Sequence, residues 1–553
     1  MAKVILVNPS VYSAGYSFIT PRWLFVLAAA TPIELAGDPI LIDETLEAFD
    51  GRWVARGDVV GIGISSGNCP AGYRVLREAK SRGATVVMGG IHATIFPDEP
   101  LEMGADCVVT GNGDLVWSTV IRDALHGHLH KRYDGGRVLG DLLCKGRWDL
   151  LDPSRYLFPS VQTVAGCPEN CSFCSVWVTD GRQPRRRLVA NVIEEVTALH
   201  ELGYRFVIFA DDNFTPATLG RIARELNPAR RRELEKLREE RLHFFDEYNR
   251  SAPDGIFGCT QMTAEVASDP EYLSALYHKM RIRQALIGVE SYSREGLVSA
   301  NKSWNPAGQD MIEALHRIQS AGIVVLTSII SGLETDTVES IRASQQFALD
   351  SGASIAQFTV YQPLPGTKDY FEMIADRRNL GSPGYVPKHK TRILYDRFWL
   401  TGLRAADIIE HANMTSEELV AQNRRCWDAY YSPREILRRI RTGMPTQWSF
   451  GGKLAYFIGS IAFRRVFAGH GAAADNTRKE KMGLLTRVLL KLSIGCYSFF
   501  HRRRSVRLAV RIARPATAPR GVPTEAPLVK IANAPRLSTD AGESLREGRG
   551  LPG

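Results

Sequence analysis

Three cysteines stand close together in the segment AGCPENCSFCSVW, residues 165–177: Cys167, Cys171 and Cys174. A structural zinc site uses four ligands, usually as two separated pairs, and the histidine nearest to these cysteines along the chain is His200. Iron–sulfur clusters take thiolate ligands, and a cubane cluster held by only three thiolates keeps one iron open for a substrate or cofactor. The spacing therefore indicates an iron–sulfur cluster that takes part in chemistry.

The remaining cysteines indicate a reducing compartment. They are scattered singly, whereas a secreted disulfide framework would be denser: Cys69, Cys107, Cys144, Cys259, Cys426 and Cys496. The start, MAKVILVNPS, has the pattern of a strand and not of a signal peptide. We expect a cytoplasmic protein, and its 553 residues allow two to four domains.

The net charge of +9 is concentrated near the C-terminus. The segment from Arg478 to Arg514 holds eleven lysines and arginines against one acid, Glu480. The rest of the chain is close to neutral, so no nucleic-acid partner is expected.

Residues 1–145 alternate apolar runs with helical stretches, which predicts an α/β domain with a doubly wound parallel sheet. The predicted strands are 3–9, 39–43, 58–65, 84–90 and 106–111, and residues 69–83 have helical spacing. Small and polar residues follow three of these strands and predict a ligand face: Ser65, Ser66, Gly89, Gly90, Thr110 and Gly111. No G-x-G-x-x-G opens a helix, which disfavours a dinucleotide site.

Residues 150–390 repeat the alternation, which predicts a partial or full βα barrel. The predicted strands are 160–166, 205–213, 256–263, 284–291, 323–332 and 356–367. The charged run within 217–250 predicts a solvated insertion helix. Residues 391–514 are expected to form a helical, basic C-terminal region, and residues 515–553, rich in Pro, Ala, Gly and Ser, a disordered tail.

The cysteine triplet resembles the signature of the radical S-adenosylmethionine (SAM) enzymes, in which an aromatic residue precedes the third cysteine, here Phe173. The resemblance implies that Cys167, Cys171 and Cys174 ligate a 4Fe-4S cluster and that SAM chelates the fourth iron. Electron transfer into SAM then yields methionine and a 5′-deoxyadenosyl radical. It also implies a βα barrel whose first strand precedes the triplet, as the strand at 160–166 does.

The same resemblance implies SAM contacts at several strand ends. FADDNF (209–214) places Asp211 and Asp212 after the second strand, and GVES (288–291) places Glu290 after the fourth. SIISGL (328–333) is similar to the fifth-strand G-x-I-x-G motif behind the adenine, with Gly332 in place and Ser328 replacing the first glycine.

The first domain resembles the cobalamin-binding domain of cobalamin-dependent radical SAM proteins. MGGIHATIFPDE (88–99) carries G-G-x-H-x-T, while VVTGNGD (108–114) departs from G-E-G-E at Asn112 and Asp114. This resemblance implies that the ligand face named above binds cobalamin. The D-x-H-x-x-G loop whose histidine ligates cobalt is absent, so His92 is expected to be structural or to lie behind the direct contacts.

These resemblances imply an enzyme that functionalises, and by our first hypothesis methylates, an unactivated carbon. A radical rearrangement or cyclisation is the alternative. A methylthiotransferase that acts on RNA could use Cys69, Cys107 and Cys144 for a second cluster, and a non-catalytic iron–sulfur protein is a further possibility. Expected partners are a small-molecule or lipid substrate and an electron donor such as flavodoxin or ferredoxin. The basic C-terminal region could rest on an anionic membrane surface.

Overall fold

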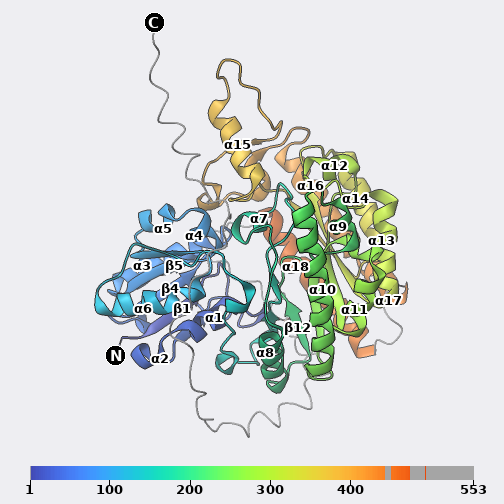
Figure 1. Cartoon of the computed structure of the whole chain (residues 1–553). Coiled ribbons are helices and arrows are strands. Elements are labelled where there is room, and N and C mark those ends of the chain that lie inside the picture. Colours follow the sequence, from blue (N-terminus) through green and yellow to red (C-terminus); the bar gives the residue numbers. More distant parts are fainter. Residues whose placement is uncertain (1, 443–449, 474–487, 489–491, 493–553) are drawn as a thin grey trace.

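The computed structural model describes residues 2–442, 450–473, 488 and 492. A parallel sheet forms its first part, drawn in blue in Figure 1. Its strands are, in spatial order, β3 (Ile40–Asp43), β1 (Val4–Asn8), β4 (Val59–Gly63), β5 (Thr85–Gly89), β6 (Cys107–Thr110) and β7 (Arg132–Asp134). The strand order changes direction between β1 and β4, and ligands of doubly wound sheets bind at the carboxyl ends beside such a point.

Helices cover the first sheet, which explains why its strands read as continuous apolar runs. The helices are α1 (Arg22–Ala30), α2 (Ile33–Ala36), α3 (Cys69–Ser81), α4 (Ile91–Ile95), α5 (Asp98–Glu102) and α6 (Trp117–His126). Two glycines on one face of β4 make room for tryptophans: a Cβ on Gly61 would lie 2.7 Å from the Trp117 ring, and one on Gly63 would lie 2.6 Å from the Trp23 ring.

The second sheet is a partial barrel of parallel strands. In spatial order they are β16 (Ile355–Val360), β15 (Val324–Ser331), β14 (Ile282–Glu290), β13 (Phe257–Met262), β12 (Phe206–Phe209) and β9 (Ser160–Val161). Within the described part of the chain, β9 and β16 do not pair with each other, so the barrel is open. The predicted α/β fold with two parallel sheets is confirmed, and the barrel is the partial form.

Helices connect the barrel strands along the chain. They are α8 (Val189–Glu201), α9 (Leu219–Arg224), α10 (Pro228–Ser251), α11 (Pro270–His278), α12 (Arg294–Ser299), α13 (Gly308–Ser320) and α14 (Val338–Asp350). The prediction that the charged run at 217–250 is a solvated insertion was wrong, because α10 buries one face. Phe244, Phe245 and Tyr248 are buried there together with the long side chain of Arg241.

Segments that follow the barrel pack against its edge strand β16 and against one another. They are α15 (Lys368–Asn379), β17 (Arg392–Ile393), β18 (Ile409–Glu410), α16 (Ser416–Tyr430), α17 (Pro433–Thr442) and α18 (Phe450–Ala473). The indole of Trp427 on α16 donates to the backbone oxygen of Phe358 on β16, at 2.8 Å. In Figure 1, α15 lies above the space between the two sheets.

The basic segment from Arg478 to Arg514, apart from Val488 and Leu492, and the predicted tail at 515–553 lie outside the described residues. In the part that is described, we find no helix with both the length and the apolar character needed to cross a bilayer.

Buried polar contacts join the two sheets into one body. Glu195 on α8 accepts hydrogen bonds from Arg22 at the start of α1 (3.1 Å) and from the indole of Trp148 (3.1 Å). Arg187 forms a second, fully buried ion pair with the same carboxylate at 2.6 Å. Removing one member of such a group leaves a buried charge unpaired, so these contacts fix how the two parts sit together.

Candidate functional site

The cysteine loop runs from β10 (Val164–Ala165) to α7 (Val176–Thr179), and neighbouring segments hold its backbone. The amide of Cys167 donates to the oxygen of Gly181 at 3.2 Å, and the amide of Ser172 donates to the oxygen of Ala300 at 3.1 Å. The Asn301 side chain donates to the oxygen of Asn170 at 2.9 Å. The loop is therefore set in place by its protein surroundings.

The three thiols suit a multi-iron cluster. Burial raises the pKa of all three, that of Cys171 to about 12, so cluster binding must displace protons to give thiolates. Their sulfur atoms do not form a group within 4.8 Å, the spacing that suits one metal ion; among the described residues only Cys69, His92 and Glu99 do. The three thiols are free and come from one loop, as the proposed ligand set requires.

Asp211 and Asp212 hold the strand that leads into the cysteine loop. One oxygen of Asp211 accepts from the amides of Thr163 (2.6 Å) and Val164 (3.1 Å), and the other accepts from the Thr163 hydroxyl. Asp212 accepts from the amide of Gly166, next to Cys167, at 2.8 Å. Both carboxylates position the loop, and their contact with SAM stays a prediction.

Glu290 ends β14 in a strained conformation. Its φ of 64° lies in the left-handed region, and the pairing of β14 with β15 shifts register between Gly288 and Glu290. Strain of this kind in a residue other than glycine concentrates at functional sites. Its carboxylate accepts from the ammonium of Lys302 at 2.9 Å, and Lys302 is itself buried. Lys302 could not be predicted as a site residue, because no sequence motif indicates its ion pair with Glu290, twelve positions earlier.

The other predicted SAM residues take different places. Phe173 is half-buried and packs on the main core. Ser328 lies on β15 beside Gly288 and Gln357, on the strand face it shares with Leu326 and Ile330. Gly332 has a φ of 98°, and a Cβ there would lie 2.9 Å from Leu419, so a glycine is required at this turn. Contact of these three residues with SAM stays a prediction.

A chain of hydrogen-bonded polar groups starts at Ser66 of the predicted cobalamin face. The hydroxyl of Ser66, after β4, lies 3.0 Å from Nδ1 of His92, whose Nε2 lies 2.9 Å from a Glu99 oxygen. Burial alone raises the pKa of Glu99, but hydrogen bonds from His92, Tyr73 and Trp399 hold it below its usual value. Both ring nitrogens of His92 already have hydrogen-bond partners. These hydrogen bonds explain why His92 and Glu99 lie close together, and with Cys69 they form the group described above. His92 is structural here, as expected.

The other residues of that face form the rim of the strand ends. The backbone of Gly90 has a φ of 96°, and a Cβ there would lie 2.6 Å from the oxygen of Ile64, so only glycine fits. A Cβ on Gly111, whose φ is 67°, would likewise lie 2.6 Å from the oxygen of Gly136. Thr110 donates to Asp134 at 3.1 Å. The side chain of Ser65 is exposed, and Gly89 ends β5 opposite Gly63.

Two pockets lie beside the strand ends of the barrel, and one of them is also lined by the first sheet. One, of about 50 Å³, is lined by Ser66 and Gly67 from the first sheet, by Gln362 and Leu364 after β16, and by Trp399. It has room for one group of a ligand and not for a whole macrocycle. The second, of about 210 Å³, is lined by residues after β15 and β16 and from α15: Leu333, Glu334, Tyr361, Asp369, Met373, Lys388 and His389, with Ser299.

Cys69, Cys107 and Cys144 come from three separate segments of the first part of the chain. Cys107 is fully buried in β6, and Cys69 is fully buried at the start of α3. Burial raises the pKa of all three thiols, that of Cys144 to about 12. A thiol inside a sheet strand, such as that of Cys107, is expected to behave as a small apolar side chain, which disfavours the methylthiotransferase alternative.

Two family models match the chain. The model of the radical SAM superfamily matches residues 161–348, which hold the cysteine loop and most of the barrel. The model of the B12 binding domain matches residues 15–120, most of the first sheet and its ligand face.

Curated relatives and a solved structure extend over most of the chain. An uncharacterized methyltransferase of Pyrococcus horikoshii is 26% identical over 474 residues, 79% of this chain and 94% of the relative. The hopanoid C-2 methylase of Rhodopseudomonas palustris is 27% identical over 433 residues, 76% of this chain and 73% of the relative. The methyltransferase TsrM of Kitasatospora setae, solved with cobalamin and a [4Fe-4S] cluster, shares the fold with a TM-score of 0.58 at 15% identity, covering 90% of this chain and all of that one.

Proposed function

Because this chain is an enzyme that joins a B12-binding domain to a radical SAM domain, we propose that it adds a methyl group to an unactivated carbon of a small molecule. The bound cluster and SAM supply a radical that removes a hydrogen atom, and bound cobalamin supplies the methyl group. Two curated relatives carry the names methyltransferase and methylase, which supports methyl transfer over other radical reactions.

The contacts of α15 carry this proposal. The amide of Asp369, in its first turn, donates to the oxygen of Ser172 in the cysteine loop at 3.2 Å. The next residue, Tyr370, packs edge-on against Phe96, which follows α4 of the B12-binding domain, with ring centroids 6.0 Å apart. One helical turn thus touches both the cluster loop and the cobalamin domain. A reaction that needs both cofactors at one substrate requires this proximity.

The residues of the barrel mouth have separate tasks in this proposal. Cys167, Cys171 and Cys174 hold the cluster, and their burial keeps water away from it. Asp211 and Asp212 fix the backbone that presents Cys167. We assign the strained, lysine-paired Glu290 to SAM binding and Ser66 to cobalamin binding.

The 210 Å³ pocket is the proposed site for a polar part of the substrate. His389 lies 3.3 Å from a carboxylate oxygen of Glu334 and 3.3 Å from one of Glu372. The hydrogen bond to Glu334 raises the pKa of His389, and burial raises the pKa of Asp369. This lining offers donors and acceptors, so we propose a substrate that carries hydroxyl, amino or carboxyl groups near the carbon that reacts.

The test is an anaerobic reaction of the reconstituted protein, with cobalamin, over a metabolite extract and SAM labelled in its methyl group. The expected result is a product that carries the label, with 5′-deoxyadenosine formed alongside it. The variant Cys174→Ala is the control and forms neither product, because a cluster ligand is missing.

Two outcomes would contradict methyl transfer. An isomeric or ring-closed product without label would establish the rearrangement or cyclisation alternative. A reconstituted protein that binds its cluster but does not cleave SAM with dithionite would be a non-catalytic iron–sulfur protein.

A further inference from the structure

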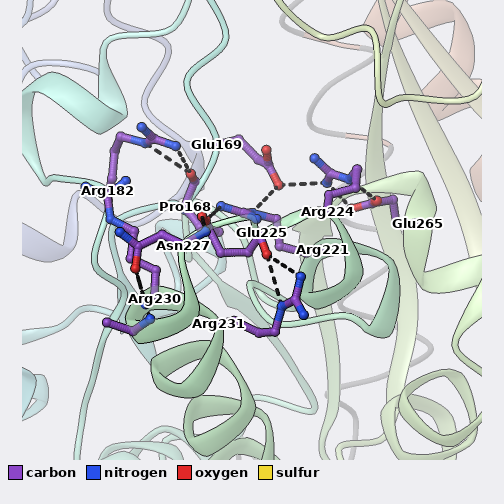
Figure 2. A network of polar contacts seen from close by, with 11 residues as sticks. Pro168, Glu169, Arg182, Arg221, Arg224, Glu225, Asn227, Arg230, Arg231 and Glu265 are labelled. Carbon is purple, nitrogen blue, oxygen red and sulfur yellow. Dashed lines mark hydrogen bonds and ion pairs between the residues drawn. The ribbon is translucent and has the colours of Figure 1, made fainter.

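Arginines gather on the outer side of the cysteine loop, where the loop approaches the protein surface. Figure 2 shows this network, which joins the loop to α9, to the start of α10 and to Arg182. We call three exposed side chains of this region, those of Arg182, Arg230 and Arg231, the arginine patch.

The patch contacts the cluster loop directly. The guanidinium of Arg182 donates two hydrogen bonds, of 3.2 and 3.1 Å, to the backbone oxygen of Pro168, the residue after Cys167. On the inner side of the network, buried Glu169 pairs with Arg221 at 3.2 Å and with Arg224 at 3.1 Å. The exposed guanidinium of Arg182 is therefore hydrogen-bonded to the residue next to Cys167, a proposed cluster ligand.

The three guanidiniums of the patch are not held in ion pairs among the described residues, although the charges of Glu169 and Glu225 act on Arg182. Glu169, Glu225 and Glu265 all pair with Arg221 or Arg224. Among the described residues, Arg182, Arg230 and Arg231 have no carboxylate in an ion pair; Arg231 donates instead to the backbone oxygen of Glu225. Burial lowers the pKa of Arg182, and the positive charges of Arg230 and Arg221 lower it further.

Helix stability does not explain this charge. Arg230 and Arg231 stand in the first turn of α10, which contains no acid. The partial positive charge at a helix N-terminus favours acids in that turn and disfavours arginines. The helix dipole therefore does not account for the two arginines, although Arg231 also holds the backbone oxygen of Glu225.

An exposed apolar side chain lies close to the patch along the chain. Leu226, between α9 and α10, is 87% exposed. Apolar side chains with charged neighbours are common in transient protein interfaces.

We propose that the arginine patch, together with the neighbouring Leu226, docks the acidic electron-donor protein that reduces the cluster. The proposal rests on the proposed function, because radical SAM enzymes need an external reductant. The donor loses one electron and the cluster gains it, and no bond or proton changes place. Charge complementarity favours an acidic partner of the flavodoxin type. The hydrogen bonds from Arg182 to Pro168 place this patch beside the segment that carries Cys167.

The test compares two reductants on the reconstituted full-length holoenzyme. 5′-Deoxyadenosine formation is measured with dithionite and with flavodoxin kept reduced by its reductase and NADPH. We expect the double variant Arg230→Glu/Arg231→Glu to raise the apparent KM for flavodoxin ~10-fold at low ionic strength, since steering by charge acts on association. The dithionite rate should stay within about twofold of wild type, because a small reductant needs no docking surface.

The matched control reverses the same number of charges elsewhere. Arg250, at the far end of α10, and Arg342, on α14, are both exposed. The variant Arg250→Glu/Arg342→Glu should keep the wild-type KM for flavodoxin. The neutral variant Arg230→Gln/Arg231→Gln should show a smaller effect, and it replaces the charge reversal if that variant folds poorly.

Two results would overturn the docking surface. One is an equal KM for flavodoxin in the patch and control variants. The other is a dithionite rate that falls as much as the flavodoxin rate, which would assign the arginines to support of the cluster loop. Binding of flavodoxin, measured by calorimetry at low ionic strength, is the second readout. This binding measurement tests the docking surface even if the wild-type enzyme fails to cleave SAM. A failure of the docking proposal can therefore be told apart from a failure of the proposed function.

Discussion

At the scale of single residues, the site depends on buried charges that the protein itself satisfies. Lys302 pairs with Glu290 at 2.9 Å and also donates to the oxygen of Gly288 at 2.9 Å. The strained backbone of Glu290 persists because this pair and the sheet hold it.

Replacing Lys302 by Met should lower the free energy of unfolding by about 3–5 kcal/mol, because it leaves the Glu290 carboxylate buried and unpaired. The double variant Lys302→Met/Glu290→Gln should recover most of that loss, since neither group is then charged. Urea denaturation of the cluster-free protein measures both values. A double variant as unstable as the single one would show that Lys302 acts through packing alone.

Asp212 gives the protein a pH-dependent stability. Burial, and then the nearby charge of Asp180, raises its pKa from its usual value to about 7. Between about pH 4 and pH 7 the folded protein therefore holds a proton that the unfolded chain has lost, so stability falls as the pH rises through this window.

The variant Asp212→Asn should lose this dependence, because the amide oxygen still accepts from Gly166 and carries no charge. Relative to wild type, it should be more stable at pH 8 by at least ~1 kcal/mol and similar at pH 4. Chemical denaturation at the two pH values measures the difference, with exposed Asp310→Asn as the control. Parallel pH profiles for wild type and Asp212→Asn would contradict the assignment.

At the scale of elements, α10 connects the barrel wall to the cysteine loop. The buried guanidinium of Arg241 donates to the Thr163 hydroxyl (3.0 Å) and to the oxygen of Phe214 (3.0 Å). It also lies 4.9 Å from the ring centroids of Phe244 and Phe245. Thr163 in turn donates to Asp211, so one hydrogen-bond network joins α10, the end of β12 and the start of β10.

The variant Arg241→Leu should destabilise the protein by about 3–5 kcal/mol, because it leaves Asp211 without the positive charge that faces it. It should also reduce the iron retained after reconstitution, since Asp211 orients the strand that leads to Cys167. The exposed neighbour Lys236→Leu is the control and should leave both the urea midpoint and the iron content unchanged. A destabilised Arg241→Leu variant that retains its full iron content would show that α10 does not support the cluster loop.

The sequence was informative where local patterns decide the structure. The strands of both sheets were predictable because helices bury them on two faces and their residues are continuously apolar. The opposite holds for α10: its many charged residues suggested a solvated helix, whereas Arg238 and Arg241 are buried by partners 31 and 78 positions away. No window of the sequence contains both ends of such contacts.

At the scale of the whole molecule, the cobalamin face and the segment after the barrel are coupled. The indole of Trp399 donates to both oxygens of Glu99, at 3.1 and 3.2 Å, and its ring stacks on Phe96. Glu99 in turn holds His92, and His92 holds Ser66. The 300 positions between Glu99 and Trp399 explain why the motif around His92 was recognised while its supporting residue was missed.

The variant Glu99→Gln should weaken cobalamin binding roughly tenfold, because an amide cannot accept from His92, Tyr73 and Trp399 as a buried carboxylate does. Absorbance titration of the protein with cobalamin measures the dissociation constant without any turnover. Glu102→Gln, on the same helix and paired with exposed Arg397, is the control and should bind normally. Equal affinities in the two variants would assign the buried chain to folding alone.

The strand order of the barrel also bears on how the protein is made. From β9 to β16 each strand lies beside the one synthesised just before it. A nascent chain can therefore extend this sheet one edge at a time as it leaves the ribosome, each new strand following a helical crossover. The first sheet departs from this order once, because β4 joins β1 on the side opposite to β3; from β4 to β7 each strand again lies beside its predecessor. We expect slow codons to be tolerated better within the barrel than between β1 and β4.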